Sequence, residues 1–485
     1  MPVMPRWPIS LGTSTIAGCA LAIVCTCACA QTAAPSYSAF VIQGERGIAM
    51  ARVITDAASC PILNLDQGNV PMQLRAAAET IPLRATRSAP ADSKPAAFPV
   101  LTCEAVIPDG TLSAAVYGQA LPLPAKTVQR IVVIGDTGCR LKKSEAAYQA
   151  CNDQRQYPFT RIAAQAAEWK PDLVIHVGDY LYRENRCPVD QTGCAGSPWG
   201  YGWDAWLADF FQPAAALLRT APWIMARGNH ESCSRAGQGW WRFLDPRPLI
   251  AGRDCNRAGN DDVGDYSDPY AVPIGGATQV LVFDTSGTVN KIIPKDDIRA
   301  IKYSRLYRQI SALAQQSPYN IGVDHHPLLG FAAEQNGRGE TVLLPGNRGL
   351  QSVFSRIDPA LLPPDIQIML SGHVHVWEAL SFSGPQPTQF VAGFSGTEED
   401  TVPLPVTLPA NATPAVGAVV AHFSSWVNGF GYMTMERSGP GRWEVKIWNT
   451  DGKQMNACHV NGKHTVCDIA QVQRENWTDK SAAIK

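Results

Sequence analysis

Continuous apolar runs, separated by helix-forming stretches, are the feature that most limits the fold of this chain. Runs of this kind are typical of strands that are covered on both faces. They lie at 131–134, 173–177, 223–226, 280–283, 321–323 and 366–370, with helical stretches at 159–169, 203–219 and 298–315. Alternating strands and helices predict an α/β fold.

Five of these runs are each followed closely by a short polar motif. The motifs are Gly135-Asp136-Thr137-Gly138, Gly178-Asp179-Tyr180-Leu181-Tyr182, Gly228-Asn229-His230-Glu231, His325-His326-Pro327 and Gly372-His373-Val374-His375. In open α/β sheets, ligands bind just past the carboxyl ends of the strands. Carboxylates, an amide, a phenol and imidazoles are the side chains that a two-metal hydrolytic site uses. The motifs therefore predict a metal centre.

The order of these motifs resembles that of the calcineurin-like metallophosphoesterase superfamily, over roughly residues 130–400. Most of that superfamily begins with Asp-x-His, whereas Asp136 here precedes Thr137 and Gly138. Tyr182, three residues after Asp179, follows the pattern of the purple acid phosphatase branch. The resemblance implies a metallophosphoesterase-type layered β-sheet core flanked by helices.

The resemblance also implies two metal ions and a ligand set. One position would be held by Asp136, Tyr182 and His375, the other by Asn229, His325 and His373, with Asp179 bridging the two. A phenol ionises only near pH 10, so binding as a phenolate favours a strongly Lewis-acidic ion such as Fe(III). The second ion could be Fe, Zn or Mn, because the ligand types do not distinguish them.

His325 and His326 require a choice. Neighbouring side chains on a strand point to opposite faces, which would leave only one of the two as a ligand. The family pattern His-x-Pro selects His325 before Pro327, whereas Val-x-x-His would select His326 after Val323. We favour His325, because the proline is the tighter marker.

His230 is interpreted as a catalytic residue rather than a ligand. With Asn229 it would bind the substrate, steadying the phosphate or helping to protonate the leaving oxygen. Glu231 would orient His230 or cap the following helix. Purple acid phosphatases often carry a further histidine after His-x-Pro, but residues 328–340 contain none. Proton delivery would then depend on His230, His326 or water, which leaves the pH optimum open.

The implied reaction is hydrolysis of phosphate monoesters by a metal-bound hydroxide, as in an acid phosphatase. A phosphodiesterase or nucleotide hydrolase on the same centre is the enzymatic alternative. The alternative of another class is a surface protein that binds phosphate without turnover. The expected substrate is a small phosphate ester.

The first thirty residues resemble a secretory signal. Arg6 precedes an apolar stretch over about 9–24, and Ala28-Cys29-Ala30 is a small-x-small cleavage site. The stretch 16–19 resembles a lipobox, so a lipid anchor at Cys19 is the alternative. We expect an exported protein, periplasmic or secreted, with a small β-rich N-terminal domain over 31–125 and a catalytic domain with C-terminal strands over 126–485.

The cysteine content agrees with export. Ten of the 14 cysteines follow Ala30, and an even number in an exported chain indicates disulfides. Connectivity does not follow from sequence alone. Near-neighbour spacing favours Cys139–Cys151, Cys187–Cys194, Cys233–Cys255 and Cys458–Cys467, which leaves Cys60–Cys103.

The net charge of the chain indicates whether nucleic acid is a plausible partner. The formal net charge of the 485 residues is −1, and no basic stripe is present to neutralise nucleic-acid phosphates. No nucleic-acid binding is therefore expected. No run after residue 30 is long and apolar enough to span a bilayer. The oligomeric state stays open.

Overall fold

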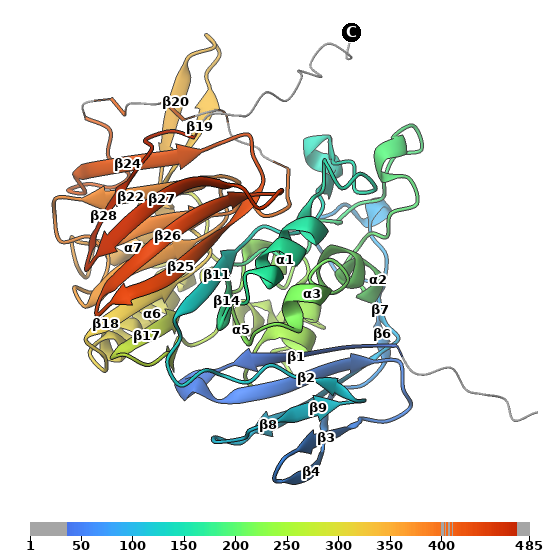
Figure 1. Cartoon of the computed structure of the whole chain (residues 1–485). Helices are drawn as coiled ribbons and strands as arrows, with labels where there is room; N and C mark the ends of the chain where they lie inside the picture. Colours follow the sequence, from blue (N-terminus) through green and yellow to red (C-terminus); the bar gives the residue numbers. More distant parts are fainter. Residues whose placement is uncertain (1–35, 399–401, 403, 406–407, 410, 473–485) are drawn as a thin grey trace, which may run out of the picture. The chain divides into compact units, whose positions relative to one another are not determined.

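Two large β-sheets form the centre of the protein. The computed structural model describes residues 36–472, except 399–401, 403, 406–407 and 410. The predicted signal sequence and Cys19 lie outside the described residues. Within them, one sheet has 11 strands and the other has seven (Figure 1).

The larger sheet contains, at its centre, the strands that precede the first three polar motifs. In spatial order its strands are β28 (His464–Cys467), β27 (Gln454–Asn461), β26 (Arg442–Asn449), β25 (Gly431–Gly439), β11 (Arg130–Ile134), β14 (Leu173–His176), β15 (Trp223–Met225), β1 (Tyr37–Gln43), β2 (Ala49–Thr55), β8 (Leu101–Ile107) and β5 (Gln73–Ala76). β11, β14 and β15 run parallel, with Val133 opposite Ile175 and Ile175 opposite Ile224. Their carboxyl ends therefore meet at one edge of the sheet.

The smaller sheet contains the strands that precede the other two polar motifs. Its order is β16 (Tyr270–Pro273), β17 (Thr278–Val282), β18 (Tyr319–Val323), β21 (Ile366–Ser371), β23 (Thr388–Ala392), β22 (Trp377–Phe382) and β24 (Val420–Trp426). β17, β18, β21 and β23 are parallel to one another. The strands predicted from apolar runs are all present, whereas the antiparallel strands at the sheet edges carry weaker patterns.

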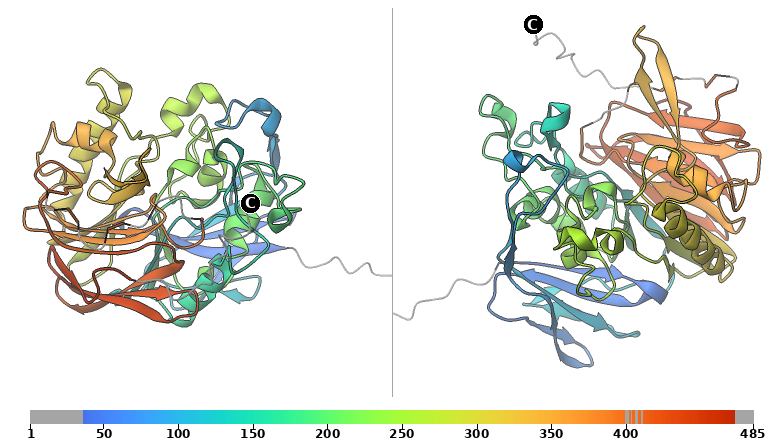
Figure 2. Two further views of the ribbon diagram at one scale, coloured as in Figure 1. Left: turned by 90° about the horizontal axis from the view of Figure 1, so that it is seen from above. Right: turned by 180° about the vertical axis from the view of Figure 1, so that it is seen from behind.

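The two sheets pack face to face, with helices on their outer faces. One apolar cluster joins inward side chains of both sheets, including Ile131, Val133, Val280 and Val323. α1 (Phe159–Glu168), α2 (Trp203–Trp206) and α3 (Ala215–Leu218) contribute to a second cluster on the outer face of the larger sheet. α6 (Ile298–Ala314) and α7 (Arg348–Phe354) contribute to a third, on the outer face of the smaller sheet. The result is the predicted layered β-sheet core flanked by helices (Figure 2).

The remaining helices and sheets are short. The helices are α4 (Gly237–Gly239) and α5 (Asp261–Gly264), and the predicted helix 203–219 is instead divided into α2, the π-helical turn η5 (Leu207–Phe211) and α3. The small sheets are formed by β3 (Ile62–Leu65), β4 (Gly68–Pro71), β9 (Ala114–Val116) and β10 (Gln119–Ala120), by β6 (Glu79–Ile81) and β7 (Ala96–Phe98), by β12 (Leu141–Lys142) and β13 (Ala147–Tyr148), and by β19 (Phe331–Gln335) and β20 (Thr341–Pro345).

The N-terminal region is rich in β-strands and extends the larger sheet. β1 pairs in parallel with β15, with Ile42 opposite Trp223. The Arg52 guanidinium, buried on β2, donates to the Phe243 carbonyl at 2.7 Å. The predicted domain boundary near residue 125 stays a prediction, but these contacts join residues 36–120 closely to the strands of the metal-site motifs.

Five disulfides confirm the pairing that near-neighbour spacing favours. They are Cys60–Cys103, Cys139–Cys151, Cys187–Cys194, Cys233–Cys255 and Cys458–Cys467. Disulfides of this number indicate an oxidising environment. Among the described residues, every helix is too short or too polar to cross a membrane.

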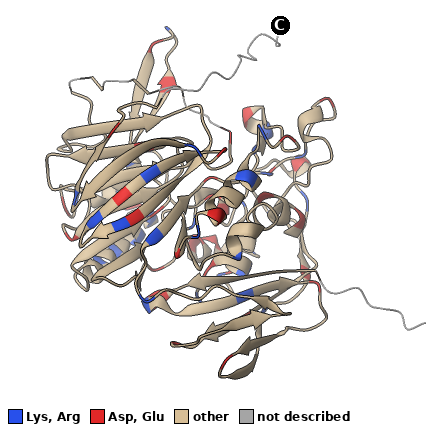
Figure 3. Ribbon diagram, viewed as in Figure 1, with Lys and Arg blue, Asp and Glu red and all other residues tan. Residues whose placement is uncertain are grey.

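Charged residues of both signs share the strands of the larger sheet. β25 carries Glu436 and Arg437, and β26 carries Arg442, Glu444 and Lys446 (Figure 3). On β26, Glu444 lies 2.6 Å from His459 of β27. Interspersed charges of this kind solvate the outer face of an antiparallel sheet.

Glu378 is a carboxyl group enclosed in the smaller sheet. It is fully buried on β22, and both of its oxygens accept from the Phe331 amide, at 3.0 and 3.2 Å. Burial raises the pKa of Glu378 to about 8. A group with a raised folded-state pKa contributes stability that is complete below the unfolded pKa and is lost as the pH rises through the folded pKa.

We therefore expect the wild-type protein to lose up to about 4 kcal/mol of unfolding free energy at this site between pH 4.5 and pH 8. Glu378→Gln cannot ionise and should show a flatter dependence, as measured by denaturant unfolding at pH 5 and pH 8. Glu436→Gln, at an exposed position on β25, is the control and should follow the wild type. Parallel curves for Glu378→Gln and the wild type would contradict the expectation.

Candidate metal centre

The five motifs lie in loops that follow β11, β14, β15, β18 and β21. Backbone hydrogen bonds join these loops: Asp136 N–H donates to the Gly178 carbonyl, and Gly372 N–H donates to the His325 carbonyl, both at 3.0 Å. The His373 amide donates to Asp136 Oδ2 at 3.0 Å. These hydrogen bonds bring the loops after β11, β14, β18 and β21 together at the carboxyl ends of their strands.

Unusual backbone conformations accompany this convergence. Asp136, Asp179 and His373 all have left-handed backbones, with φ of 53°, 58° and 71°. This backbone conformation is uncommon for residues other than glycine, and residues that adopt it cluster at functional sites. Gly228 allows the loops to approach closely, since a Cβ there would lie 2.0 Å from Asp179 Oδ1.

The Tyr182 phenol lies among three acceptors. Its oxygen is 2.7 Å from Asp136 Oδ1, 2.8 Å from Asp179 Oδ2 and 2.9 Å from His375 Nε2. His375 Nδ1 lies 2.7 Å from the Glu398 carbonyl, which fixes a proton on Nδ1 and leaves Nε2 as an acceptor in the neutral ring. A phenol has one proton to donate, so it cannot satisfy all three groups. A cation can, so these residues fit a metal ion.

A second group of acceptors adjoins the first. His325 Nδ1 donates to the Val177 carbonyl at 2.9 Å, so its Nε2 faces Asp179 Oδ2 and Asn229 Oδ1, each at 3.1 Å. Burial alone would lower the pKa of His325. The Asp179 carboxylate outweighs burial and raises the pKa to about 9. A positive charge is thus favoured at this position, as a proton or as a metal ion.

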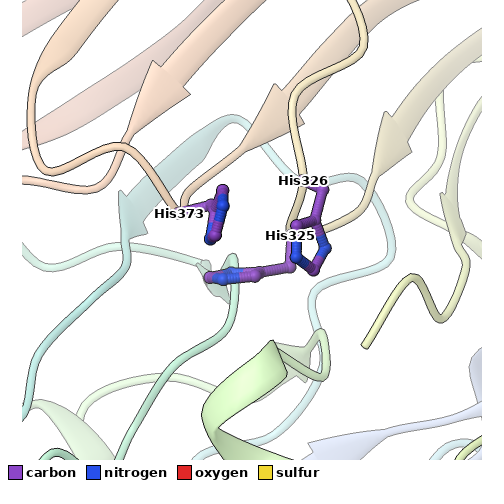
Figure 4. Close-up of side chains that lie close together, drawn as sticks. All are labelled: His325, His326 and His373. Carbon is purple, nitrogen blue, oxygen red and sulfur yellow. The ribbon is translucent and has the colours of Figure 1, made fainter. Parts of the chain in front are cut away.

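His326 joins this second group. The donor atoms of His325, His326 and His373 lie within 4.8 Å of one another, as do those of Asp136, Asp179 and His325. The imidazoles of the three histidines lie close together (Figure 4), with 4.3 Å between the ring centroids of His326 and His373. Strand alternation does not separate His325 from His326, because β18 ends at Val323 and both histidines lie in the loop.

His230 is held by two residues that the sequence did not indicate. Arg235 Nη2 lies 2.7 Å from His230 Nε2 and, since arginine only donates, Nε2 must accept. His230 Nδ1 lies 2.9 Å from Glu184 and 3.0 Å from the Leu181 carbonyl. Glu184 also accepts from Arg235 Nε at 2.7 Å. Burial, followed by Arg235, lowers the pKa of His230 to about 4, so its ring is neutral at pH 7.

Two further carboxylates fix the backbones of the loops. Asp209 on η5 accepts from the amides of Cys139 at 3.0 Å and Tyr182 at 2.8 Å, and from Arg183 Nε at 2.5 Å. Glu231, in the turn η6 (Asn229–Glu231), accepts from the amides of Asp179, Tyr180, Leu181 and Gly228 at 2.8 to 3.2 Å. The expected capping role of Glu231 is present at η6 itself, where its side chain accepts from the Gly228 amide, and its other contacts hold the second motif.

The layered α/β core and the buried donor set at its edge define a metallophosphoesterase, a hydrolase of phosphoric esters. Residues 129–377, just over half of the chain, match the family model of the calcineurin-like phosphoesterases. The chain belongs to this family, whose members use a binuclear metal centre.

Solved structures share the fold at low sequence identity. A purple acid phosphatase from seeds of yellow lupin (Lupinus luteus) is 13% identical, with a TM-score of 0.52 over 90% of this chain and 75% of the other. The protein PhoD is 10% identical, with a TM-score of 0.48 over 90% of this chain and 94% of the other. No curated protein sequence matches the chain significantly. The lupin enzyme supports the fold assignment alone.

Proposed function

We propose that the protein hydrolyses phosphate monoesters at a binuclear metal centre. The observation that carries the proposal is the crowding of Asp136, Asp179 and His375 around the single hydroxyl of Tyr182. Buried acceptors that outnumber the available protons require a cation to be stable. Membership of a metallophosphoesterase family supports the same reading.

We propose Asp136, Tyr182 and His375 as ligands of one ion. Asn229, His325 and His373 would hold the second ion. Asp179 suits the bridging role, because the same oxygen, Oδ2, lies 2.8 Å from the Tyr182 hydroxyl and 3.1 Å from His325 Nε2. His326 adjoins the second position and is the alternative imidazole there.

The proposed identity of the first ion rests on the phenol. Burial, Asp136 and Asp179 all raise the pKa of Tyr182 well above its usual value. Only a strongly Lewis-acidic ion would displace that proton near neutral pH, so we propose Fe(III) at this position, with Fe, Zn or Mn at the other. When bound, two such ions activate water and offset the negative charge that develops on the phosphoryl oxygens.

The protein side chains would position the ester. The His230 ring lies over the Tyr182 ring at 3.7 Å between centroids and is fixed by Arg235 and Glu184. A neutral ring with both nitrogens engaged is poorly suited to donate a proton. We therefore propose that Asn229 orients the phosphate, that His230 packs against the Tyr182 ring beside it, and that the proton for the leaving oxygen comes from solvent.

Turnover of an aryl phosphate monoester and of the matching diester, between pH 4 and pH 9, tests this function on protein purified with its native metals. We expect kcat/KM to be at least about 10-fold higher for the monoester, because only its dianion matches two adjacent cations fully. A preference for the diester would identify a phosphodiesterase. Binding of phosphate without turnover of either ester would support the non-catalytic alternative.

We also propose that the protein is exported. Five disulfides among the described residues support an oxidising compartment. The signal sequence that would direct the export, and the alternative lipid anchor at Cys19, remain predictions from the sequence.

A further inference from the structure

A cavity adjoins the candidate metal centre at His373. Its volume is about 70 Å³, which is more than a single water molecule needs. His373 and Val374 of the fifth motif line the cavity, and so does Pro327, the last residue of the fourth motif. The cavity therefore shares a wall, His373, with the proposed metal centre.

The hairpin of β19 and β20 supplies more of the wall. Phe331, Leu344 and Pro345 line the cavity. The base of the hairpin is anchored, because Phe331 pairs with Pro345 and its amide donates to the buried Glu378 carboxyl at 3.0 Å. No Lys, Arg, Asp or Glu stands among the described residues that line the cavity. A charged group would lose its hydration there without gaining a partner of opposite charge, so the cavity favours an uncharged occupant.

Asn347 adds a polar group to this mainly apolar wall. The residue lines the cavity and is only 6% exposed. Its backbone amide donates to the Pro327 carbonyl at 2.8 Å, which holds it against the fourth motif. Its Oδ1 accepts from the Leu350 amide at 2.9 Å and from Thr288 Oγ1 at 3.2 Å, and so caps α7. Because a backbone amide only donates, these contacts identify the other side-chain atom as the NH₂ group.

The NH₂ group of Asn347 is an unused donor. None of the described residues accepts a hydrogen bond from Asn347 Nδ2. A donor in a largely buried side chain costs free energy while it lacks an acceptor, and a ligand oxygen in the cavity would recover that cost. An apolar wall with one free donor suits a group that is mainly apolar and carries an uncharged oxygen.

We propose that this cavity binds the alcohol portion of the substrate, and that Asn347 is a specificity-determining residue that donates to an uncharged oxygen on it. The preferred substrates are phosphate monoesters of uncharged, mainly apolar alcohols or phenols, rather than compounds that carry a second phosphate or a carboxylate. This inference rests on the proposed phosphoesterase function and adds a substrate class to it.

Equilibrium binding of three phosphonates to the metal-loaded protein tests the proposal without turnover. The probes are benzylphosphonate and its 4-acetyl and 4-carboxy derivatives, in which a CH₂ group replaces the ester oxygen, and calorimetry measures their affinities. We expect the wild type to bind the acetyl compound at least about 10-fold more tightly than the carboxy compound, because the apolar wall cannot replace the hydration of a carboxylate.

Leu344→Lys tests the wall. It places a cation in the cavity, so we expect the carboxy compound to bind at least as tightly as the acetyl compound. Val342→Lys is the matched control, because Val342 lies on the same strand, β20, but does not line the cavity. It should keep the preference of the wild type.

Asn347→Ser tests the donor. Serine keeps an oxygen that can cap α7 and removes the NH₂ group. We expect the acetyl compound to bind about 5-fold more weakly and benzylphosphonate less than about 2-fold more weakly, because one neutral hydrogen bond is lost. Asp297→Ser changes the cap of α6 in a similar way, outside the cavity, and should bind all three probes as the wild type does.

Equal affinities of the wild type for the acetyl and carboxy compounds, or an unchanged preference in Leu344→Lys, would overturn the proposal. Equal losses of the acetyl compound and benzylphosphonate in Asn347→Ser would overturn the role of Asn347. Absence of aryl phosphate turnover in the wild type would refute the phosphatase function instead, while the binding comparison would still decide what the cavity accepts.

Discussion

Asp179→Ala should abolish metal binding and lower the rate of phosphate ester hydrolysis by about a thousandfold or more. Asp179 Oδ2 lies between the Tyr182 hydroxyl and His325 Nε2, so its loss affects both proposed metal positions. Its other oxygen accepts from the His230 amide at 2.7 Å, which also ties the third loop to the second. Metal analysis and steady-state kinetics on the purified variant provide the measurement.

Tyr182→Phe is the informative contrast. It removes the phenol but leaves both carboxylates and His375 in place. We expect it to keep most of the metal and to lose any visible absorption that arises from a phenolate bound to Fe(III). Full activity of Asp179→Ala would refute the assignment of the centre, and an unchanged spectrum of Tyr182→Phe would refute Fe(III) at the phenol.

Asp209→Ala should cost about 3 to 5 kcal/mol of unfolding free energy, because it leaves a buried arginine without its partner. Asp209 is fully buried, and the Arg183 side chain is only 5% exposed. The amides of Cys139 and Tyr182 would also lose their acceptor. Unfolding in denaturant, followed by fluorescence, gives the difference.

Asp204→Ala is the control for this variant. Asp204 lies five residues earlier, in α2, and its side chain is 49% exposed in an ion pair with Lys94. Exposed pairs contribute about 1 kcal/mol or less, so this variant should remain near wild type. If Asp209→Ala were as stable as Asp204→Ala, Asp209 would not hold the loops together.

The sequence was sufficient to predict the central strands and the polar motifs that follow them, because both depend on local patterns. The apolar runs at 131–134 and 173–177 correspond to β11 and β14, and each precedes its motif directly. Parallel strands bring their carboxyl ends together whatever their separation in the chain. The convergence of Asp136 and Asp179 could therefore be expected from the order of strands and motifs alone.

The residues that support the ligands could not be predicted in this way. Asp209 binds the Tyr182 amide from 27 residues away, in a π-helical turn that carries no distinctive pattern. Arg235 and Glu184 meet at His230 although 51 residues separate them. Such pairs depend on how the loops fold over one another, and single charged residues in loops are usually solvated.

The pair of histidines illustrates the limit of a local rule. Alternation along a strand applies only while the strand continues, and β18 ends two residues before His325. In the loop that follows, the imidazoles of both histidines lie close enough to His373 to share one metal ion with it. Strand boundaries are the least certain part of a sequence-based prediction, so arguments from alternation are weakest at the strand ends where ligands gather.

The position of β1 and β25 in the larger sheet has a consequence for the integrity of the enzyme. The strands that bear Asp136, Asp179 and Asn229 lie together, with β25 paired to β11 on one side and β1 paired to β15 on the other. Segments from before and after the catalytic region thus close both sides of the metal-site strands. A fragment cut short at either end would expose a bare strand edge, which favours aggregation. Removal of β1 or β25 is therefore expected to destabilise the strands that carry the motifs of the candidate metal centre, although neither segment supplies a proposed ligand.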